Sequence, residues 1–159
     1  MTALMQAVQR NDVAAVRKLI AQGVNVNELE PNGDAPLVMS AYEGHTEITR
    51  LLLEAGADVT AVDPGMKATA LHAAAYAGRA ADAALLVQYH VEIDKQGPYN
   101  GYTALHDAIW QNNVEVARLL IDAGANLTLR NHDGQTPLDF AKARHATPII
   151  AMIEQKMSK

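Results

Sequence analysis

The composition of this chain excludes several classes of protein. Its 159 residues are 49% hydrophobic, 19% charged and 4% aromatic, which is typical of a folded globular chain rather than a disordered one. The net charge of −5 argues against a nucleic-acid-binding surface, and no run approaches the roughly 18 apolar residues of a membrane span. There is no cysteine for disulfides or thiolate chemistry, and the N-terminus lacks the basic and apolar regions of a signal peptide. We therefore expect a single cytoplasmic domain.

A repeat of 33 or 34 residues runs through the sequence. Leucines recur at intervals of 33, 34, 34 and 33 residues, at Leu4, Leu37, Leu71, Leu105 and Leu138. An apolar triplet or its variant begins 14 residues after each leucine, and a glycine follows the first, second and fourth leucines by 19 residues. The pattern predicts five copies of one structural unit, at residues 1–29, 30–62, 63–96, 97–130 and 131–159.

Each unit is predicted to contain two helices joined by a tight turn. The first helix begins at a Thr-Pro or Thr-Ala pair, because Thr can cap a helix and Pro fits its first turn. It is rich in alanine, and Gly44 and Gly78 end it in the second and third units. The second helix ends at Gly23, Gly56 or Gly124, since glycine adopts the left-handed conformation most easily. One helix pair cannot bury its apolar face alone, so neighbouring units must stack.

The first and last units carry the polar residues expected at the ends of such a stack. The first unit shows Gln6, Gln9, Arg10 and Asn11 on its first helix, and the last unit closes with a charged helix that starts at Thr147. We expect both units to act as caps, because nothing covers the outer face of a terminal repeat. Five units then fill the chain.

Several segments resemble the ankyrin repeat nearly residue for residue. They are Asn32 to Leu37, with 43–48 and 51–58 in the same unit, and 131–138 in the last unit. The resemblance extends over residues 2–157. It implies an all-α solenoid of stacked helix-turn-helix units joined by β-turn finger loops. It also implies that the chain binds other proteins.

The sequence offers little from which to build a catalytic site. Of the two serines, Ser40 occupies a position that is alanine in the other units, and Ser158 lies in the terminal tail. With no cysteine either, a nucleophile is missing. We expect Asp82, Asp107 and Asp139 to be solvated or capping carboxylates, since nothing places two of them across a shared cleft. The prediction is a non-enzymatic protein without a cofactor.

The histidines do not predict a metal site. His72 and His106 occupy the same position in adjacent units, so stacking separates them by roughly 8–10 Å. A shared zinc ion needs each nitrogen about 2.0–2.1 Å away. In ankyrin proteins a histidine at this position typically hydrogen-bonds the backbone of the adjacent loop, and we expect that structural role for both residues and for His45. His90 and His132 have no partner at ligand spacing.

Aromatic residues concentrate on one predicted surface. Tyr42, Tyr76 and Trp110 stand five residues after the repeating leucine of the middle units, and the family resemblance places this position in a concave, ligand-binding groove. Four or five such rings, at about 150–250 Å² each, supply most of a half-interface of roughly 800 Å². The alternative is that the rings pack against one another. With neighbouring helix and finger positions, the candidate partner-binding residues are Asp34, Tyr42, Glu43, Met66, Tyr76, Tyr99, Tyr102, Trp110, Gln111 and Arg144.

Loop length points toward the middle units, and charge distinguishes the first half of the chain. The predicted finger loops at 63–66 and 96–101 contain one residue more than the other fingers, and both flank the aromatic residues. Residues 24–66 carry eight acidic side chains and one arginine, a net charge of −7 that would steer a basic partner. The alternative for the longer loops is neutral drift in loop length. The alternative for the acidic residues is a merely solvated surface.

These features predict an adaptor or inhibitor, monomeric when free, that grips a partner protein in its concave groove. The partner is unidentified, and a basic protein is one option. We expect neither nucleic acid nor a membrane as a partner. Three alternative functions stay open: an immunity-type protein that neutralises a toxin or enzyme, a regulatory ankyrin protein that senses a small molecule, and a self-associating scaffold.

Overall fold

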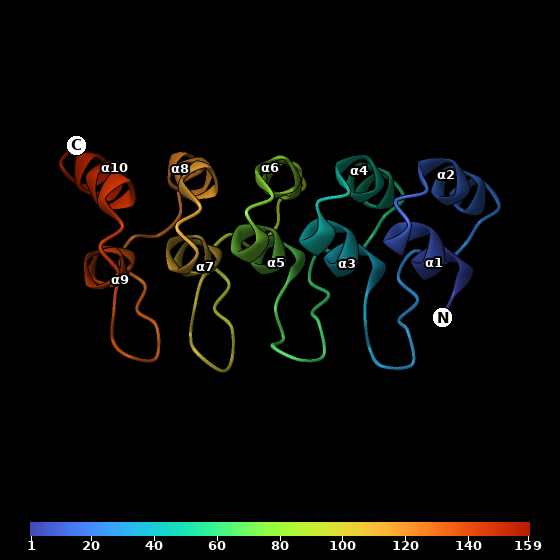
Figure 1. The fold of residues 1–159 in the computed structure, drawn as a ribbon, viewed down its shortest axis with the longest axis horizontal. Helices are drawn as coiled ribbons and strands as arrows, with labels where there is room; N and C mark the ends of the chain where they lie inside the picture. The colour runs from blue at the N-terminus through green and yellow to red at the C-terminus, as the bar shows by residue number, and fades with distance from the viewer.

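Ten α-helices form a two-layered stack in the computed structural model, which describes residues 1–159. Figure 1 shows one row of inner helices, from which the finger loops project, and a parallel row of outer helices. The inner helices are α1 (Ala3–Gln9), α3 (Pro36–Glu43), α5 (Ala70–Ala77), α7 (Ala104–Trp110) and α9 (Pro137–Ala143). The outer helices are α2 (Val13–Ala21), α4 (Thr46–Glu54), α6 (Ala80–Gln88), α8 (Val114–Asp122) and α10 (Thr147–Met157). None of them has both the length and the apolar character that crossing a bilayer requires.

The helix ends follow the predicted capping residues. The side chain of a threonine caps four of the five inner helices, and only α3, which starts after Ala35, lacks such a cap. Gly44 and Gly78 adopt left-handed conformations at the ends of α3 and α5, with φ of 75° and 77°. After α6 the left-handed position is occupied by His90, with φ of 60°, in place of the glycine found in other units.

The finger loops confirm the predicted difference in length. In the loops that begin at Glu30 and Asn131, the N–H of that residue donates to the carbonyl four residues later. In the loops that begin at Asp63 and Gly97, the corresponding bond spans five residues. The extra residue therefore lies at the tip of the two fingers that precede α5 and α7.

The apolar core runs continuously through the stack. A single cluster of 33 buried residues includes members of all five helix pairs, among them Val16, Leu52, Leu86, Leu120 and Ile153. The principal helix contacts lie within a pair or between adjacent pairs, such as α3 with α5 and α4 with α6. Each unit is thus stabilised mainly by its immediate neighbours.

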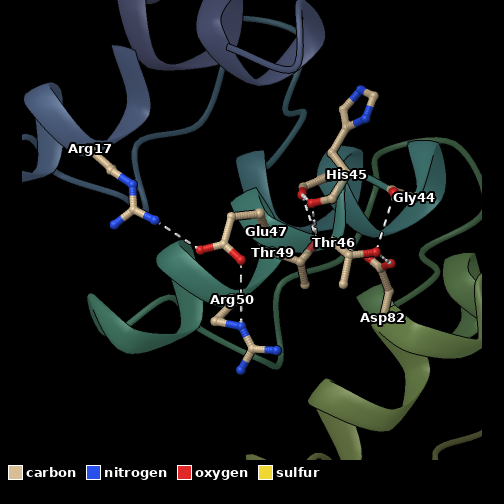
Figure 2. A network of polar contacts seen from close by, with 9 residues as sticks. Arg17, Gly44, His45, Thr46, Glu47, Thr49, Arg50 and Asp82 are labelled. Atoms are coloured by element: carbon tan, nitrogen blue, oxygen red, sulfur yellow. Dashed lines mark hydrogen bonds and ion pairs between the residues drawn. The ribbon is translucent and has the colours of Figure 1, made fainter. Parts of the chain in front are cut away.

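A buried polar network joins the second and third units (Figure 2). Asp82 of α6 is 1% exposed and accepts hydrogen bonds from the hydroxyls of Thr46 (2.7 Å) and Thr49 (2.6 Å) of α4. Ser40 extends the network, because its hydroxyl lies 2.6 Å from that of Thr49. The expectation of a solvated or capping role for Asp82 is wrong, since its carboxyl connects two outer helices. Asp139, in contrast, caps α9 as predicted by accepting the N–H of Thr136.

The structural role predicted for the His45 ring is also wrong. Its backbone carbonyl, and not its imidazole, accepts the hydroxyl hydrogen bonds of Ser40 (3.1 Å) and Thr49 (3.2 Å). In Figure 2 the His45 ring points away from the network. Only the backbone of His45 therefore takes part in the network, and any residue at this position would supply the same carbonyl.

Candidate partner-binding groove

A groove of about 610 Å³ lies between the inner helices and the finger loops. Its walls are residues of α3, α5 and α7 together with the loops that precede these helices, the middle of the inner row in Figure 1. Most of the wall is apolar. The predicted partner-binding residues that line it are Asp34, Tyr42, Glu43, Met66, Tyr76 and Trp110.

Tyr42, Tyr76 and Trp110 form an aromatic stripe along the groove, with one ring at the end of each of α3, α5 and α7. Their exposed fractions are 44%, 43% and 39%. The rings of Tyr76 and Trp110 meet edge to face, with centroids 6.2 Å apart and an interplanar angle of 86°. These two rings support each other while a large part of each stays accessible.

Side chains of the following unit hold the ends of the helices that carry the aromatic stripe. Each donates a hydrogen bond to the backbone carbonyl of the stripe residue, which has no partner within its own helix. The three bonds run from Arg79 to Tyr42 (3.0 Å), from Asn113 to Tyr76 (3.1 Å) and from Arg144 to Trp110 (3.2 Å). The backbone position of each stripe residue is thereby coupled to the neighbouring unit.

The other four predicted residues lie outside the walls of the groove. Tyr102 is half-buried, and its ring centroid lies 5.4 Å from that of Trp110, so the packing alternative describes Tyr102 correctly. The guanidinium of Arg144 lies 5.8 Å from the Trp110 ring centroid and braces this ring from the side of α9. Tyr99 and Gln111 are exposed beyond the rim.

His72 forms part of the groove wall and fixes the next finger loop. Its Nε2 lies 3.0 Å from the carbonyl of Tyr102, which can only accept, so its Nδ1 accepts the hydroxyl of Thr69 at 2.8 Å. His106 makes the same pair of contacts one unit later, which confirms the predicted structural role of both rings. Burial lowers the pKa of both imidazoles, so they are neutral near pH 7. No group of three or more His, Cys, Asp or Glu side chains is arranged to hold a metal ion.

Asp107 brings a carboxylate into the groove from the first turn of α7, one turn before Trp110. Burial raises its pKa to about 7, and no hydrogen bond or neighbouring charge offsets that effect. The expectation that Asp107 is a solvated or capping carboxylate is wrong, because its side chain lies in the groove and caps no helix.

The repeated helix pairs, the threonine caps and the finger loops agree with a family match. The family model described as ankyrin repeats (3 copies) matches residues 1–63 and 61–131. The chain belongs to the ankyrin-repeat family. The ankyrin repeat is a non-catalytic interaction fold, so its presence indicates a protein–protein interaction module.

Curated relatives carry an equivalent segment within longer chains. This chain is 28% identical over 160 residues to the mitochondrial disaggregase of Bos taurus, and the match covers 97% of the chain and 23% of the relative. It is 30% identical over 141 residues to the E3 ubiquitin-protein ligase KEG of Arabidopsis thaliana, covering 84% and 6%. It is 28% identical over 151 residues to the ankyrin repeat and SOCS box protein 11 of Homo sapiens, covering 94% and 35%. The chain spans roughly a third or less of these relatives.

Asp107 was not among the predicted binding residues, although the register of the repeats locates it. The residues that follow the repeating leucine by two are Gln6, Met39, Ala73, Asp107 and Phe140. The three middle members of this set line the groove, next to the aromatic stripe that stands three residues later. Asp107 is the one charged residue at this position in the five units, and that contrast is the signal that identifies it.

Proposed function

We propose that this ankyrin-repeat chain binds a partner protein in its groove and acts as an adaptor or inhibitor. The observation that carries the proposal is the aromatic stripe, whose three rings stay accessible along a groove of about 610 Å³. Met66, 55% exposed on the finger before α5, adds a flexible apolar contact. Tyr and Trp are enriched at binding hot spots because each buries a large area with little loss of conformational freedom. Glu43 and Asp34 supply polar contacts, and Tyr99 and Gln111 extend the surface beyond the rim.

The names of the relatives support a binding role over a specific activity. The names of a disaggregase and a ubiquitin ligase describe different activities, and both proteins contain a segment similar to this chain, as does an ankyrin repeat and SOCS box protein. What is common to them is the segment that resembles this ankyrin array. A segment that recurs in proteins of such different activities is better explained by recognition of partners than by one chemistry.

The test compares partner capture by the wild-type protein with capture by variants of the aromatic stripe. Tyr76→Ala combined with Trp110→Ala removes two accessible rings. Tyr89→Ala is the matched control, because Tyr89 is 38% exposed at the end of α6, outside the groove. A specific partner should bind the Tyr89 variant with unchanged affinity and the double variant at least about 30-fold more weakly, since each hot-spot ring contributes about 1–2 kcal/mol or more. An equal loss of affinity in both variants, or no loss in either, would place the interface elsewhere.

The partner's own activity separates an inhibitor from an adaptor. An inhibitor, including an immunity-type protein that neutralises a toxin or enzyme, should lower that activity in proportion to complex formation. An adaptor should leave the activity unchanged and bring a third component into the complex. Sedimentation of the protein alone over a range of concentrations tests our expectation of a free monomer against self-association.

A small-molecule ligand is a second candidate, favoured by the size of the groove. The volume of about 610 Å³ falls within the range of roughly 300–1,000 Å³ that ligand pockets occupy. A bound compound stabilises the folded state by mass action. A compound that raises the melting temperature of the wild-type protein, but not of the Tyr76→Ala, Trp110→Ala variant, would support this function.

A further inference from the structure

The walls of the groove carry charge of one sign. They include four carboxylates, those of Asp34, Glu43, Asp63 and Asp107, and no lysine or arginine. Asp63 accepts three backbone N–H groups of its own finger loop, and Asp34 accepts a neighbouring side-chain amide. Glu43 and Asp107 are therefore the two wall carboxylates without a partner in the chain. Charge complementarity favours a cationic occupant.

The two arginines at the rim of the groove are committed to other contacts, whereas Lys67, between Met66 and Ala68 on the finger loop before α5, is exposed outside the walls. Arg79 and Arg144 lie at its rim and donate to the backbone carbonyls of Tyr42 and Trp110. The imidazole of His72 is neutral and bonded through both nitrogens. Apolar walls focus the field of the remaining carboxylates into the groove.

We infer that the groove receives an arginine side chain of the partner, with its guanidinium paired to Asp107 and lying against the rings of Tyr76 and Trp110. This inference rests on the proposed function. Trp110 follows Asp107 by three residues in α7, so the two side chains are neighbours on one helix face. The Tyr76 ring, 6.2 Å from that of Trp110, completes the site from α5.

The setting favours guanidinium over other occupants. A wholly apolar segment would cover the Asp107 carboxylate and leave it without a partner, which is costly. A lysine ammonium is more strongly hydrated and loses more on entering a half-buried site. A guanidinium is weakly hydrated, bonds a carboxylate through two N–H groups and stacks on aromatic rings. Asp107, Tyr76 and Trp110 present these features together.

Selection from a displayed library of random peptides tests this inference. Peptides that bind the wild-type protein are first depleted on the Tyr76→Ala, Trp110→Ala variant, which leaves binders that depend on the groove. We expect these binders to be enriched in arginine, and a parallel selection on Asp107→Asn to lose that enrichment. Trp110 is the only tryptophan in the chain, so its fluorescence reports each titration directly.

A selected arginine peptide should bind Asp107→Asn at least about tenfold more weakly than wild type. Its citrulline counterpart, which keeps the shape and loses the charge, should show the same loss. Glu115→Gln is the matched control, because this exposed carboxylate of α8 lies outside the groove and its removal should change affinity less than about twofold. Groove-dependent peptides with no arginine preference, or with an equal preference for lysine, would overturn the inference alone. A selection that yields no groove-dependent peptide would overturn the proposed function as well.

The pH dependence supplies a second readout. Pairing needs the ionised carboxylate, and the pKa of Asp107 is about 7 in the free protein. Affinity for the arginine peptide should therefore rise about fourfold between pH 6.5 and pH 8, and Asp107→Asn should abolish the rise. The other titratable side chains of the groove walls are those of Asp34, Glu43, Asp63, His72 and Tyr76, and Asp133 and Arg144 lie near Tyr102 beside Asp107. Because all of them are retained in Asp107→Asn, a rise that persists in this variant would overturn the assignment to Asp107.

Discussion

The Asp107 carboxyl lies in the groove, and its burial lowers the stability of the folded protein when the carboxyl is ionised. Its pKa rises from 3.8 to about 7 because burial disfavours the charged form. The folded protein thus binds a proton more tightly than the unfolded chain, so stability falls as pH rises from about 4 through about 7. Asp107→Asn keeps the shape without the charge. We expect the variant to match wild type at pH 4 and to exceed its free energy of unfolding at pH 8 by about 1–3 kcal/mol.

Urea denaturation at both pH values measures this difference. The Glu115→Gln variant removes an exposed carboxylate and serves as the control, which should stay within about 0.5 kcal/mol of wild type at either pH. An Asp107→Asn variant less stable than wild type at pH 8 would contradict the prediction and indicate a structural role. A gain in stability together with the loss of arginine binding is the behaviour expected of a functional carboxylate.

The environments of single side chains are the feature that the sequence predicts least well. The residues of the aromatic stripe could be predicted because aromatic residues recur at the same position of the three middle units. The expectation of solvated or capping carboxylates at Asp82 and Asp107 rests on the lack of any pattern that places two of them across a shared cleft. Their environments depend on residues about thirty positions away in neighbouring units, such as Thr46 and Thr49 around Asp82. No local pattern shows which helix face an adjacent unit covers.

At the scale of elements, the finger loops of the fourth and fifth units provide a test of close contact. Gly101 and Gly134 have nearly the same φ, 72° and 77°, so alanine meets similar backbone strain at both. A Cβ at Gly101 would lie 2.5 Å from the ring of His132 and 2.8 Å from its backbone nitrogen, whereas a Cβ at Gly134 meets nothing within 4 Å. We expect Gly134→Ala to cost about 1–2 kcal/mol through φ alone, and Gly101→Ala at least about 1 kcal/mol more.

Chemical denaturation of the two variants measures both changes in the free energy of unfolding, and equal losses of stability would show that the loops separate without cost.

Elements were also the best-predicted level of the structure. Most helices begin at a threonine cap or end at a left-handed glycine, as predicted, because capping and φ are local properties. The contact between Gly101 and His132 was not predicted, since it forms between loops of different units.

At the scale of the whole molecule, stability should be distributed along the stack as unit and interface contributions, because the principal helix contacts join immediate neighbours. Asp82→Ala removes the carboxyl that joins α4 to α6, and we expect it to cost about 1–3 kcal/mol, because the hydroxyls of Thr46 and Thr49 lose their buried acceptor. Hydrogen exchange should then accelerate most in α3 to α6 and progressively less toward α10. Asp122→Ala, at an exposed site at the end of α8, should leave exchange unchanged. If Asp82→Ala instead accelerated exchange equally from α1 to α10, the stack would be opening as one unit. The groove would then share its stability with every repeat and not only with those that line it.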